Sequence, residues 1–268
     1  MKAFSTLEIM EVSVPPHVRH AMLNDDIVEA RAYQLEAVDE ALSSSMLLVM
    51  PTAAGKTAVI WMMISEKLAK GGRGIMIAPT VGLVEQHIRS MRDVLKLEDE
   101  IISITGQIPP SKRSGKWTEA RLIIATPKVV VNDVRNGVLD LSDFSILVVD
   151  EAHHCTGEHA MAQVCDHYIS DNRDPHILGV TASPGHRPEN VREICNRTGA
   201  VRIHIRNSGE EMLRGYISEL EVREITVIVP EEMVQLSEPF KIWQRGIVDR
   251  ERRLGRYIMP GMINFSGL

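Results

Sequence analysis

The hydrophobic positions of this chain fall into short continuous runs that are separated by longer amphipathic stretches. The continuous runs predict strands buried on both faces, because a strand with one solvated face would alternate apolar and polar positions. Strands that alternate with helical stretches predict an α/β fold with a parallel sheet and right-handed crossovers. The predicted strands cover residues 46–50, 74–78, 101–104, 121–125, 145–149, 176–181 and 201–205.

The stretches between the strands have the periodicity of helices. In the first of them Leu35, Val38 and Leu42 recur at helical spacing with Ala41 beside them, and we expect this stripe to be buried. The predicted helices cover residues 30–42, 57–70, 83–97, 129–136, 159–170 and 189–197.

The same pattern divides the chain into parts. A short strand over residues 9–14 fits the sequence ahead of the first helix. After the sheet, residues 221–229 alternate like a strand, and residues 231–256 are charged and helical. The predicted parts are an N-terminal lead-in (1–27), the sheet-containing domain (28–230) and a helical segment (231–268).

The segment 50–57 (MPTAAGKT) joins the first predicted strand to the second predicted helix. Backbone N–H groups in such a loop, together with the helix N-terminus, can hold a phosphate. Lys56 would reach the outer phosphates and the Thr57 hydroxyl would hold a magnesium ion. Met50 departs from the general pattern, which has Gly at that position. The alternative is a surface turn with a chance Gly-Lys-Thr, which the strand–loop–helix context disfavours.

Two adjacent carboxylates, Asp150 and Glu151, end the apolar run 145–149. Nucleotide hydrolases place a metal-holding Asp and a water-activating Glu in this way. The alternative is a charge pair at a helix N-terminus. With a phosphate loop upstream, we favour hydrolysis.

The composition bears on the size of the core, the cellular compartment and the expected partners. Of the 268 residues 44% are hydrophobic, which is enough for a substantial core. The three cysteines have no paired spacing, which favours a reducing compartment over a disulfide framework. No secretory signal and no apolar run of membrane-spanning length is evident, so we expect a cytoplasmic protein without a membrane partner. The net charge of −6 gives no general attraction for nucleic acid, although local basic segments remain.

In their order along the chain, the loop 50–57 and the carboxylate pair Asp150 and Glu151 resemble motifs of superfamily 2 helicases. In that family Asp-Glu-Ala-His, the sequence of residues 150–153 here, is the second motif. The stretches TGQIPPSKR, RLIIATP and GVTASPG around a DEAH box are similar to archaeal Hef and the Fanconi-anaemia M-type translocases. Dicer and the innate RNA-sensing helicases are more distant relatives. Further matching segments are Arg31-x-Tyr33-Gln34, Ala78-Pro-Thr80 with Leu83 and Gln86, Thr105-Gly106, Ala125-Thr-Pro127 and Val180-Thr-Ala-Ser183.

The resemblance covers roughly residues 28–230 and implies a RecA-like first motor domain followed by the start of a helical insertion. It implies an ATP hydrolase whose cofactors are ATP and Mg²⁺, the metal being held by Thr57 and Asp150. Gln34 would read the adenine edge, with Arg31 and Tyr33 supporting the base or stacking near it. The implied ATP-binding residues are Arg31, Tyr33, Gln34, Thr52, Ala53, Ala54, Gly55, Lys56 and Thr57, and the implied catalytic residues are Lys56, Asp150, Glu151 and His153.

The resemblance also implies contacts with the backbone of one nucleic-acid strand. Hydroxyl and N–H donors of this kind read phosphate but not sequence. His153, Thr181 and Ser183 would couple the ATP site to these contacts. The sequence departs from the family pattern at Lys128, where Gln is usual, and at Ala53-Ala54, where a Gly-containing pair is commoner. The implied nucleic-acid residues are Thr80, Thr105, Gly106, Thr126 and Lys128.

Three further clusters have two interpretations each. One, around a DEAH box, could bind zinc, but it lacks paired ligand spacing. A second could touch a duplex or fork around Trp117, or form a solvated loop with Trp117 packed on the sheet. A third resembles the arginine motif of a second helicase domain, or begins the helical insertion, which we favour because no second phosphate loop precedes it. The first cluster, with the candidate zinc ligands, is His153, His154, Cys155, His159, Cys165 and His167. The second, around Trp117, is Lys112, Arg113, Lys116 and Arg121. The third is Arg245, Arg250, Arg252, Arg253 and Arg256.

The sequence therefore predicts the first motor domain of an ATP-dependent DNA helicase or translocase acting on branched or forked DNA in repair and replication restart. The second motor domain is missing from this chain, so we expect weak hydrolysis by the chain alone. An RNA-directed helicase or sensor, and a non-motor nucleic-acid-binding module, are the alternatives.

Overall fold

The computed structural model describes residues 17–97, 101–185, 187–213 and 230–254, and the predicted strands over 9–14 and 221–229 lie outside them. The strands are β1 (Met46–Val49), β2 (Gly74–Ile77), β3 (Ile101–Ile104), β4 (Leu122–Ala125), β5 (Ile146–Asp150), β6 (Ile177–Thr181) and β7 (Arg202–Ile205). The α-helices are α1 (Ala32–Ser43), α2 (Lys56–Ala69), α3 (Val81–Val94), α4 (Lys116–Glu119), α5 (Pro127–Arg135), α6 (Ala160–Asp171), α7 (Pro188–Thr198) and α8 (Glu231–Arg253).

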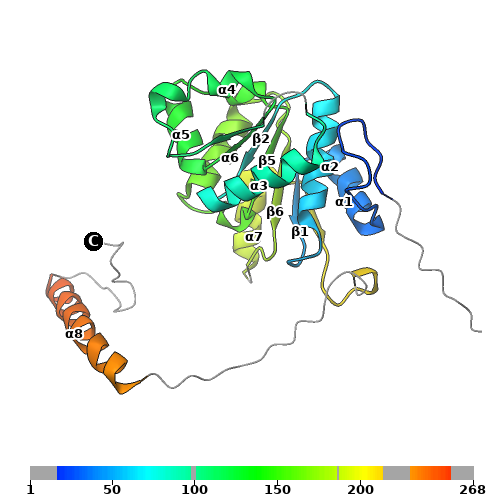
Figure 1. Ribbon diagram of the computed structural model, residues 1–268. Coiled ribbons are helices and arrows are strands. Elements are labelled where there is room, and N and C mark those ends of the chain that lie inside the picture. The colour runs from blue at the N-terminus through cyan, green and yellow to red at the C-terminus, as the bar shows by residue number, and fades with distance from the viewer. Residues whose placement is uncertain (1–16, 98–100, 186, 214–229, 255–268) are drawn as a thin grey trace, which may run out of the picture. The chain divides into compact units, whose positions relative to one another are not determined.

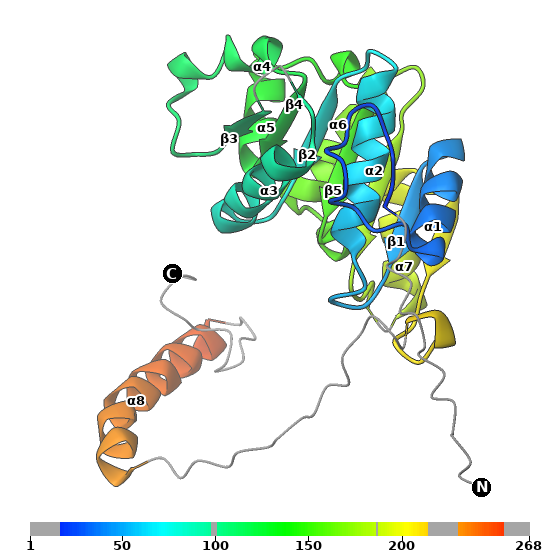
Figure 2. The same cartoon turned by 45° about the vertical axis from the view of Figure 1, so that its right-hand side comes forward.

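The seven strands form one parallel sheet in the order β3-β4-β2-β5-β6-β1-β7. This confirms the predicted α/β class and every strand that falls within the described residues. Helices α1, α2 and α3 cover one face of the sheet, and α5, α6 and α7 cover the other (Figures 1 and 2).

Alternate strand residues supply the two cores. In β1, Met46 and Leu48 pack beneath α1 and α2, whereas Leu47 and Val49 face α6 and α7. All four side chains are buried because helices cover both faces. The continuous apolar runs of the sequence therefore reflect burial of the strands on both faces, as predicted.

The predicted buried stripe of the first helix is wrong in part. Leu35 is 38% exposed, while Tyr33 and Gln34 are almost fully buried. Both buried side chains hydrogen-bond to the loop after β1, so a polar residue takes a core position that hydrophobic periodicity assigned to Leu35. Val38 and Ala41 are buried as predicted.

Some helix ends differ from the predicted ones. Helix α3 ends at Val94 because Leu95 leaves the helix and forms an isolated antiparallel bridge with Leu23. The helix predicted over 231–256 is present as α8 to Arg253, and its last predicted residues lie outside the described part.

The chain divides into two compact units, Met1–Ser218 and Glu219–Leu268. Within the part of the chain that the structure describes, no helix combines the length and the apolarity needed to cross a bilayer.

Strand register brings the candidate chemistry to one edge of the sheet. Val49 lies opposite Thr181, and Asp150 lies opposite Val180. The carboxyl ends of β1, β5 and β6 therefore meet, and ligands of open parallel sheets bind at such an edge.

Candidate functional site

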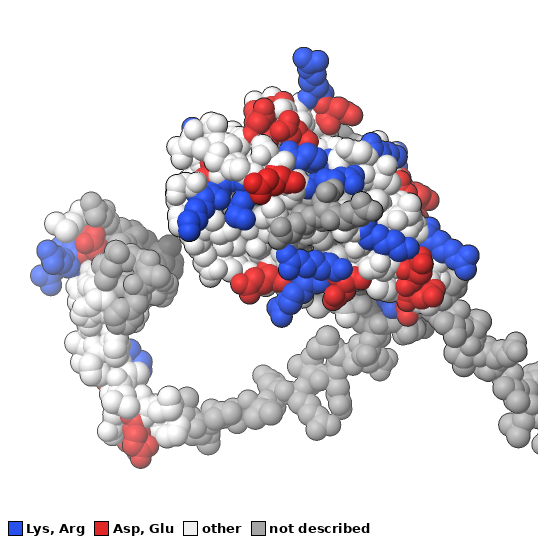
Figure 3. All heavy atoms as spheres, turned by 45° about the horizontal axis from the view of Figure 1, so that its top comes forward, with Lys and Arg blue, Asp and Glu red and all other residues white. Residues whose placement is uncertain are grey.

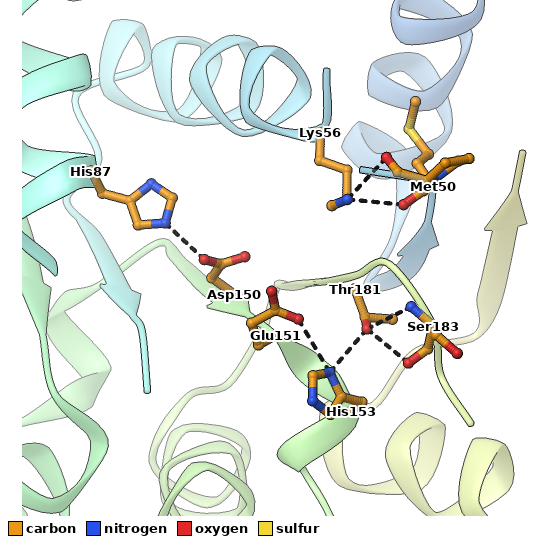
Figure 4. A network of polar contacts seen from close by, with 9 residues as sticks. Met50, Lys56, His87, Asp150, Glu151, His153, Thr181 and Ser183 are labelled. Carbon is orange, nitrogen blue, oxygen red and sulfur yellow. Dashed lines mark hydrogen bonds and ion pairs between the residues drawn. The ribbon is translucent and has the colours of Figure 1, made fainter. Parts of the chain in front are cut away.

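The loop after β1 has the backbone shape of a phosphate cradle. Ala53 and Gly55 adopt positive φ angles of 68° and 82°, and α2 begins at the next residue, Lys56. The Lys56 ammonium donates to the carbonyls of Met50 at 2.9 Å and Pro51 at 3.1 Å (Figure 4). The loop thus curls around the amine that would contact phosphate, with the helix N-terminus beside it.

Met50 occupies the position at which the general phosphate-loop pattern has a glycine. Its side chain is fully buried in the core beneath α1 and α2, and its N–H donates to the carbonyl of Thr181. The residue anchors the loop to β6, and only its carbonyl faces Lys56.

Burial lowers the pKa of Lys56, and the nearby carboxylates of Glu151 and Asp150 oppose that shift. A cation that is partly removed from water and faces two carboxylates is suited to hold an anionic group. Phosphate oxygens could replace the loop carbonyls as acceptors for its three N–H donors.

A hollow of about 280 Å³ lies beside this loop and is lined in part by Arg31, Gln34, Gly55 and Thr57. Arg31 forms an ion pair with Glu29 at 2.7 Å. Arg31 and Gln34, two of the three residues predicted to surround the adenine base, thus line the hollow, with the phosphate loop at its rim.

Tyr33 does not line the hollow. Its side chain is 1% exposed, and its hydroxyl donates to the Ala54 carbonyl at 3.0 Å and accepts from Arg31. Of the two roles predicted for Tyr33, supporting the base site agrees with this position and stacking on the base does not. Gln34 also donates to the carbonyls of Ala54 and Gly55, so the first turn of α1 holds the loop in place.

Beyond β5, the chain turns sharply at Glu151, which adopts the left-handed conformation with φ 56°. The turn directs Asp150 and Glu151 in different directions (Figure 4). Asp150 Oδ2 accepts from His87 Nε2 at 2.8 Å. Glu151 lies 3.2 Å from His153 Nδ1. Positive φ costs energy for a non-glycine residue, and such residues occur often at functional sites.

A chain of hydrogen bonds runs from His153 to the end of β6. His153 Nδ1 lies 3.1 Å from Thr181 Oγ1, which donates to the Ser183 carbonyl and accepts from the Ser183 N–H. Thr181 has one hydroxyl proton, so His153 must be the donor in its contact with Thr181. The predicted coupling residues therefore form one connected network with Glu151 (Figure 4).

The predicted nucleic-acid residues lie at the ends of the other strands. Thr80 follows β2, Thr105 and Gly106 follow β3, and Thr126 follows β4. Since β3, β4 and β2 are consecutive in the sheet, these residues occupy the half of the edge next to the ATP-site half. Thr80 Oγ1 caps α3 by accepting from the Leu83 N–H.

The predicted nucleic-acid residues differ from one another in exposure. Gly106 and Lys128 are exposed, and Thr126 is partly exposed. Thr105 is only 5% exposed, and its hydroxyl accepts from the Gln107 N–H. A backbone contact at this position would therefore come from Gly106 rather than from the Thr105 side chain.

The basic patch around Trp117 is charged surface only in part, because Lys112 is exposed whereas Arg113 and Arg121 bond to other parts of the protein. Arg113 is 6% exposed and forms a two-pronged ion pair with Asp133, and Trp117 Nε1 donates to the same carboxylate. Arg121 donates to the carbonyl of Leu68. The predicted packing of Trp117 on the sheet is confirmed, but the loop around it is not solvated throughout, because Arg113 is buried. On the face shown in Figure 3, basic and acidic side chains are interspersed, and neither sign forms a continuous field.

A model of the DEAD/DEAH box helicase family matches residues 31–191, which is more than half of the chain. The matched span contains the phosphate loop, both carboxylates and Thr181. The chain belongs to the DEAD/DEAH box helicase family. Membership implies that its phosphate loop binds ATP.

Individual helicases are also similar to this chain. A putative ATP-dependent RNA helicase of Methanocaldococcus jannaschii is 37% identical over 217 residues, which are 80% of this chain and 28% of that protein. The ATP-dependent DNA helicase mph1 of Aspergillus fumigatus is 30% identical over 260 residues, which are 92% of this chain and 23% of that protein. The chain thus spans about a quarter of the length of these helicases.

The helicase domain of Pyrococcus furiosus Hef has a similar structure, with a TM-score of 0.71 and 30% identity. The match covers 92% of this chain and 53% of that domain. This confirms the RecA-like fold and the predicted likeness to Hef, and the coverage fits a first motor domain.

The donor atoms of this helicase domain fit a magnesium ion. Thr57 supplies a hydroxyl at the start of α2, and Asp150 supplies a carboxylate at the end of β5. Magnesium prefers oxygen ligands and commonly keeps several waters while binding one or two protein oxygens and phosphate. Zinc would require other partners: the Cys155 and Cys165 sulfurs are buried 3.9 Å apart, and His153 contacts Glu151 and Thr181.

His87 is a residue of the site that no sequence motif indicates. It lies on the buried side of α3 with Val84 and Met91, so its hydrophobic periodicity is that of a core position. Its sequence neighbour Gln86 belongs to a matched helicase motif, but nothing in that motif places His87 against Asp150, which is 63 residues away.

Proposed function

We propose that this chain is the first motor domain of an ATP-dependent DNA helicase or translocase that acts on branched or forked DNA in repair and replication restart. The observation that carries the proposal is the shared sheet edge, where Lys56 and Thr57 face Asp150 and Glu151 beside a second set of strand-end residues. The likeness to mph1, which is named as a DNA helicase, supports DNA as the substrate.

The residues divide the work of hydrolysis. Lys56 exchanges its loop carbonyls for the outer phosphate oxygens, and the loop N–H groups hold the remaining charge. Bound magnesium supplies positive charge that stabilises the phosphates during transfer. Glu151 orients and deprotonates the attacking water. His153 contacts Glu151 and Thr181 through Nδ1, and Thr181 in turn bonds Ser183, so a change in either part reaches the other through direct polar contacts.

Two variants test this assignment. Lys56→Ala should lose nucleotide binding, because it removes the one amine that the loop encloses. Glu151→Gln should bind ATP yet turn it over at least about a hundredfold more slowly, because an amide cannot accept the proton. Fluorescent-nucleotide titration and phosphate release measure the two effects separately. Normal turnover by Glu151→Gln would refute the base assignment.

An RNA-directed helicase or sensor is the second candidate, and the name of the Methanocaldococcus relative favours it. Backbone contacts alone do not select the sugar. Competition between matched DNA forks and RNA duplexes for the same protein decides between them, since a preference for RNA would remove the DNA assignment. A non-motor binding module would fail to bind ATP in the same titration.

A further inference from the structure

His87 has no part in the function proposed so far, although it touches the metal-holding carboxylate. The side chain is 6% exposed and lies on the inner face of α3. Its Nε2 lies 2.8 Å from Asp150 Oδ2, which is ideal for a hydrogen bond to a carboxylate. An ionised carboxylate can only accept, so Nε2 carries the proton.

The contact uses only one of the two carboxylate oxygens. In Figure 4, Oδ2 faces His87 and the other oxygen of Asp150 points toward the side of the site that holds Lys56. A free carboxylate can rotate about its terminal torsion, which is broad. A bond to one oxygen removes that freedom and keeps the second oxygen directed toward the phosphate loop.

His87 itself is held by packing rather than by a further polar partner. Its Nδ1 is buried and has no hydrogen-bond partner among the described residues. Leaving a buried polar atom unpaired costs roughly 1–3 kcal/mol. An apolar side chain would avoid that cost at a position flanked by Val84, Ile88 and Met91, which are all buried. The bond to Asp150 is the one feature of this site that an apolar residue could not provide.

We propose that His87 is a positioning residue that fixes Asp150 for magnesium. This inference rests on the proposed ATPase function. Groups that orient metal-binding side chains commonly change metal affinity 10–100-fold when they are removed. The residue acts through Asp150 and touches neither nucleotide nor metal.

The test measures nucleotide binding as a function of magnesium in the 268-residue chain. A fluorescent ATP analogue is titrated with Mg²⁺ for the wild type, His87→Ala, His87→Gln and Glu85→Ala. His87→Ala should raise the apparent Mg²⁺ dissociation constant about tenfold or more, with unchanged analogue binding in excess chelator. His87→Gln should restore most of the affinity, because its amide N–H can replace Nε2. Glu85→Ala, an exposed position on the same helix, should match the wild type.

Equal magnesium requirements for the wild type and His87→Ala would overturn the inference, as would a failure of His87→Gln to restore affinity. If His87→Ala does not fold, the wild type still provides a test. The His87 imidazole ¹⁵N resonance, assigned by its loss in His87→Gln, should shift when Mg²⁺ is added to the nucleotide-bound chain, and an unchanged resonance would contradict the proposal. A wild type that binds no nucleotide would instead refute the ATPase function.

Discussion

At the scale of single residues, the phosphate loop depends on Gly55, because a neighbouring side chain leaves no room for a Cβ atom there. A Cβ atom on Gly55 would lie 2.1 Å from Gln34 Nε2, and the backbone there has φ 82°. Gln34 donates to the carbonyls of Ala54 and Gly55, so the same amide both holds the loop and lines the hollow beside it.

Gly55→Ala should therefore displace Gln34 and weaken nucleotide binding by at least about tenfold, or roughly 1.4 kcal/mol. Gly71→Ala is a matched control, because Gly71 has φ 81° but nothing within 4 Å of the added Cβ. Both variants should lose about 1 kcal/mol of unfolding free energy through the positive φ. Thermal unfolding and nucleotide titration separate the effects, and wild-type affinity in Gly55→Ala would contradict the expectation.

A second residue, His176, is held neutral in the folded protein. Its Nε2 donates to the Ala41 carbonyl at 2.7 Å, and its Nδ1 accepts from the Lys67 ammonium at 3.0 Å. Burial, followed by the charge of Lys67, lowers the pKa of His176. Protonation would break the contact with Lys67 and place two cations together.

This pKa shift predicts a pH dependence of stability. The unfolded chain takes up a proton near pH 6.5 while the folded chain does not, so the unfolding free energy decreases as pH falls from about 6.5 toward the lowered folded pKa. One proton limits this slope to about 1.4 kcal/mol per pH unit. His176→Gln keeps a donor and an acceptor but cannot titrate, so denaturant unfolding between about pH 7 and 5 should show a smaller slope. Equal slopes would refute the assignment.

At the scale of elements, a buried ion pair fixes the long connection between β3 and β4. Arg113 donates to both oxygens of Asp133 on α5 and to the Ile108 carbonyl, and Trp117 donates to Asp133 as well. The connection begins with Thr105 and Gly106, and α5 follows Thr126, so the network ties together two segments that are predicted to contact nucleic acid.

Asp133→Ala should destabilise the domain by about 3–5 kcal/mol, because it leaves a buried guanidinium without its partner. Asp166→Ala removes the partner of Arg197 in an exposed ion pair between helices, and it should cost no more than about 1 kcal/mol. Chemical denaturation of both variants measures the difference. A similar small loss in both would mean that the buried pair does not anchor the connection.

At the scale of the whole molecule, the site occupies one open edge of one sheet. Efficient phosphoryl transfer in motors of this kind uses arginines from a second domain to stabilise transition-state charge, an effect worth orders of magnitude in rate. We therefore expect this chain alone to bind ATP–Mg²⁺ modestly, hydrolyse it slowly and leave duplexes intact. Phosphate release and fork-unwinding assays check this, and robust unwinding at nanomolar protein would contradict it.

Much of this architecture could be predicted because its causes are local in sequence. Continuous apolar runs indicate the strands, and strand-end motifs indicate Lys56, Thr57, Asp150 and Glu151 as candidate site residues. Predictions failed where a distant partner decided the outcome. Leu35 is exposed because Gln34 takes the buried position to bond the phosphate loop, and Arg113 is buried because Asp133 neutralises it.

The sequence alone thus determined the fold class, the family likeness and the candidate residues for ATP, since periodicity and motif spacing are properties of short segments. Tertiary structure decided the strand order, which sets the predicted nucleic-acid residues beside the ATP site. It also decided the contact between His87 and Asp150. Neither follows from sequence, because crossover connections bring segments together through packing and side-chain chemistry that no local pattern encodes.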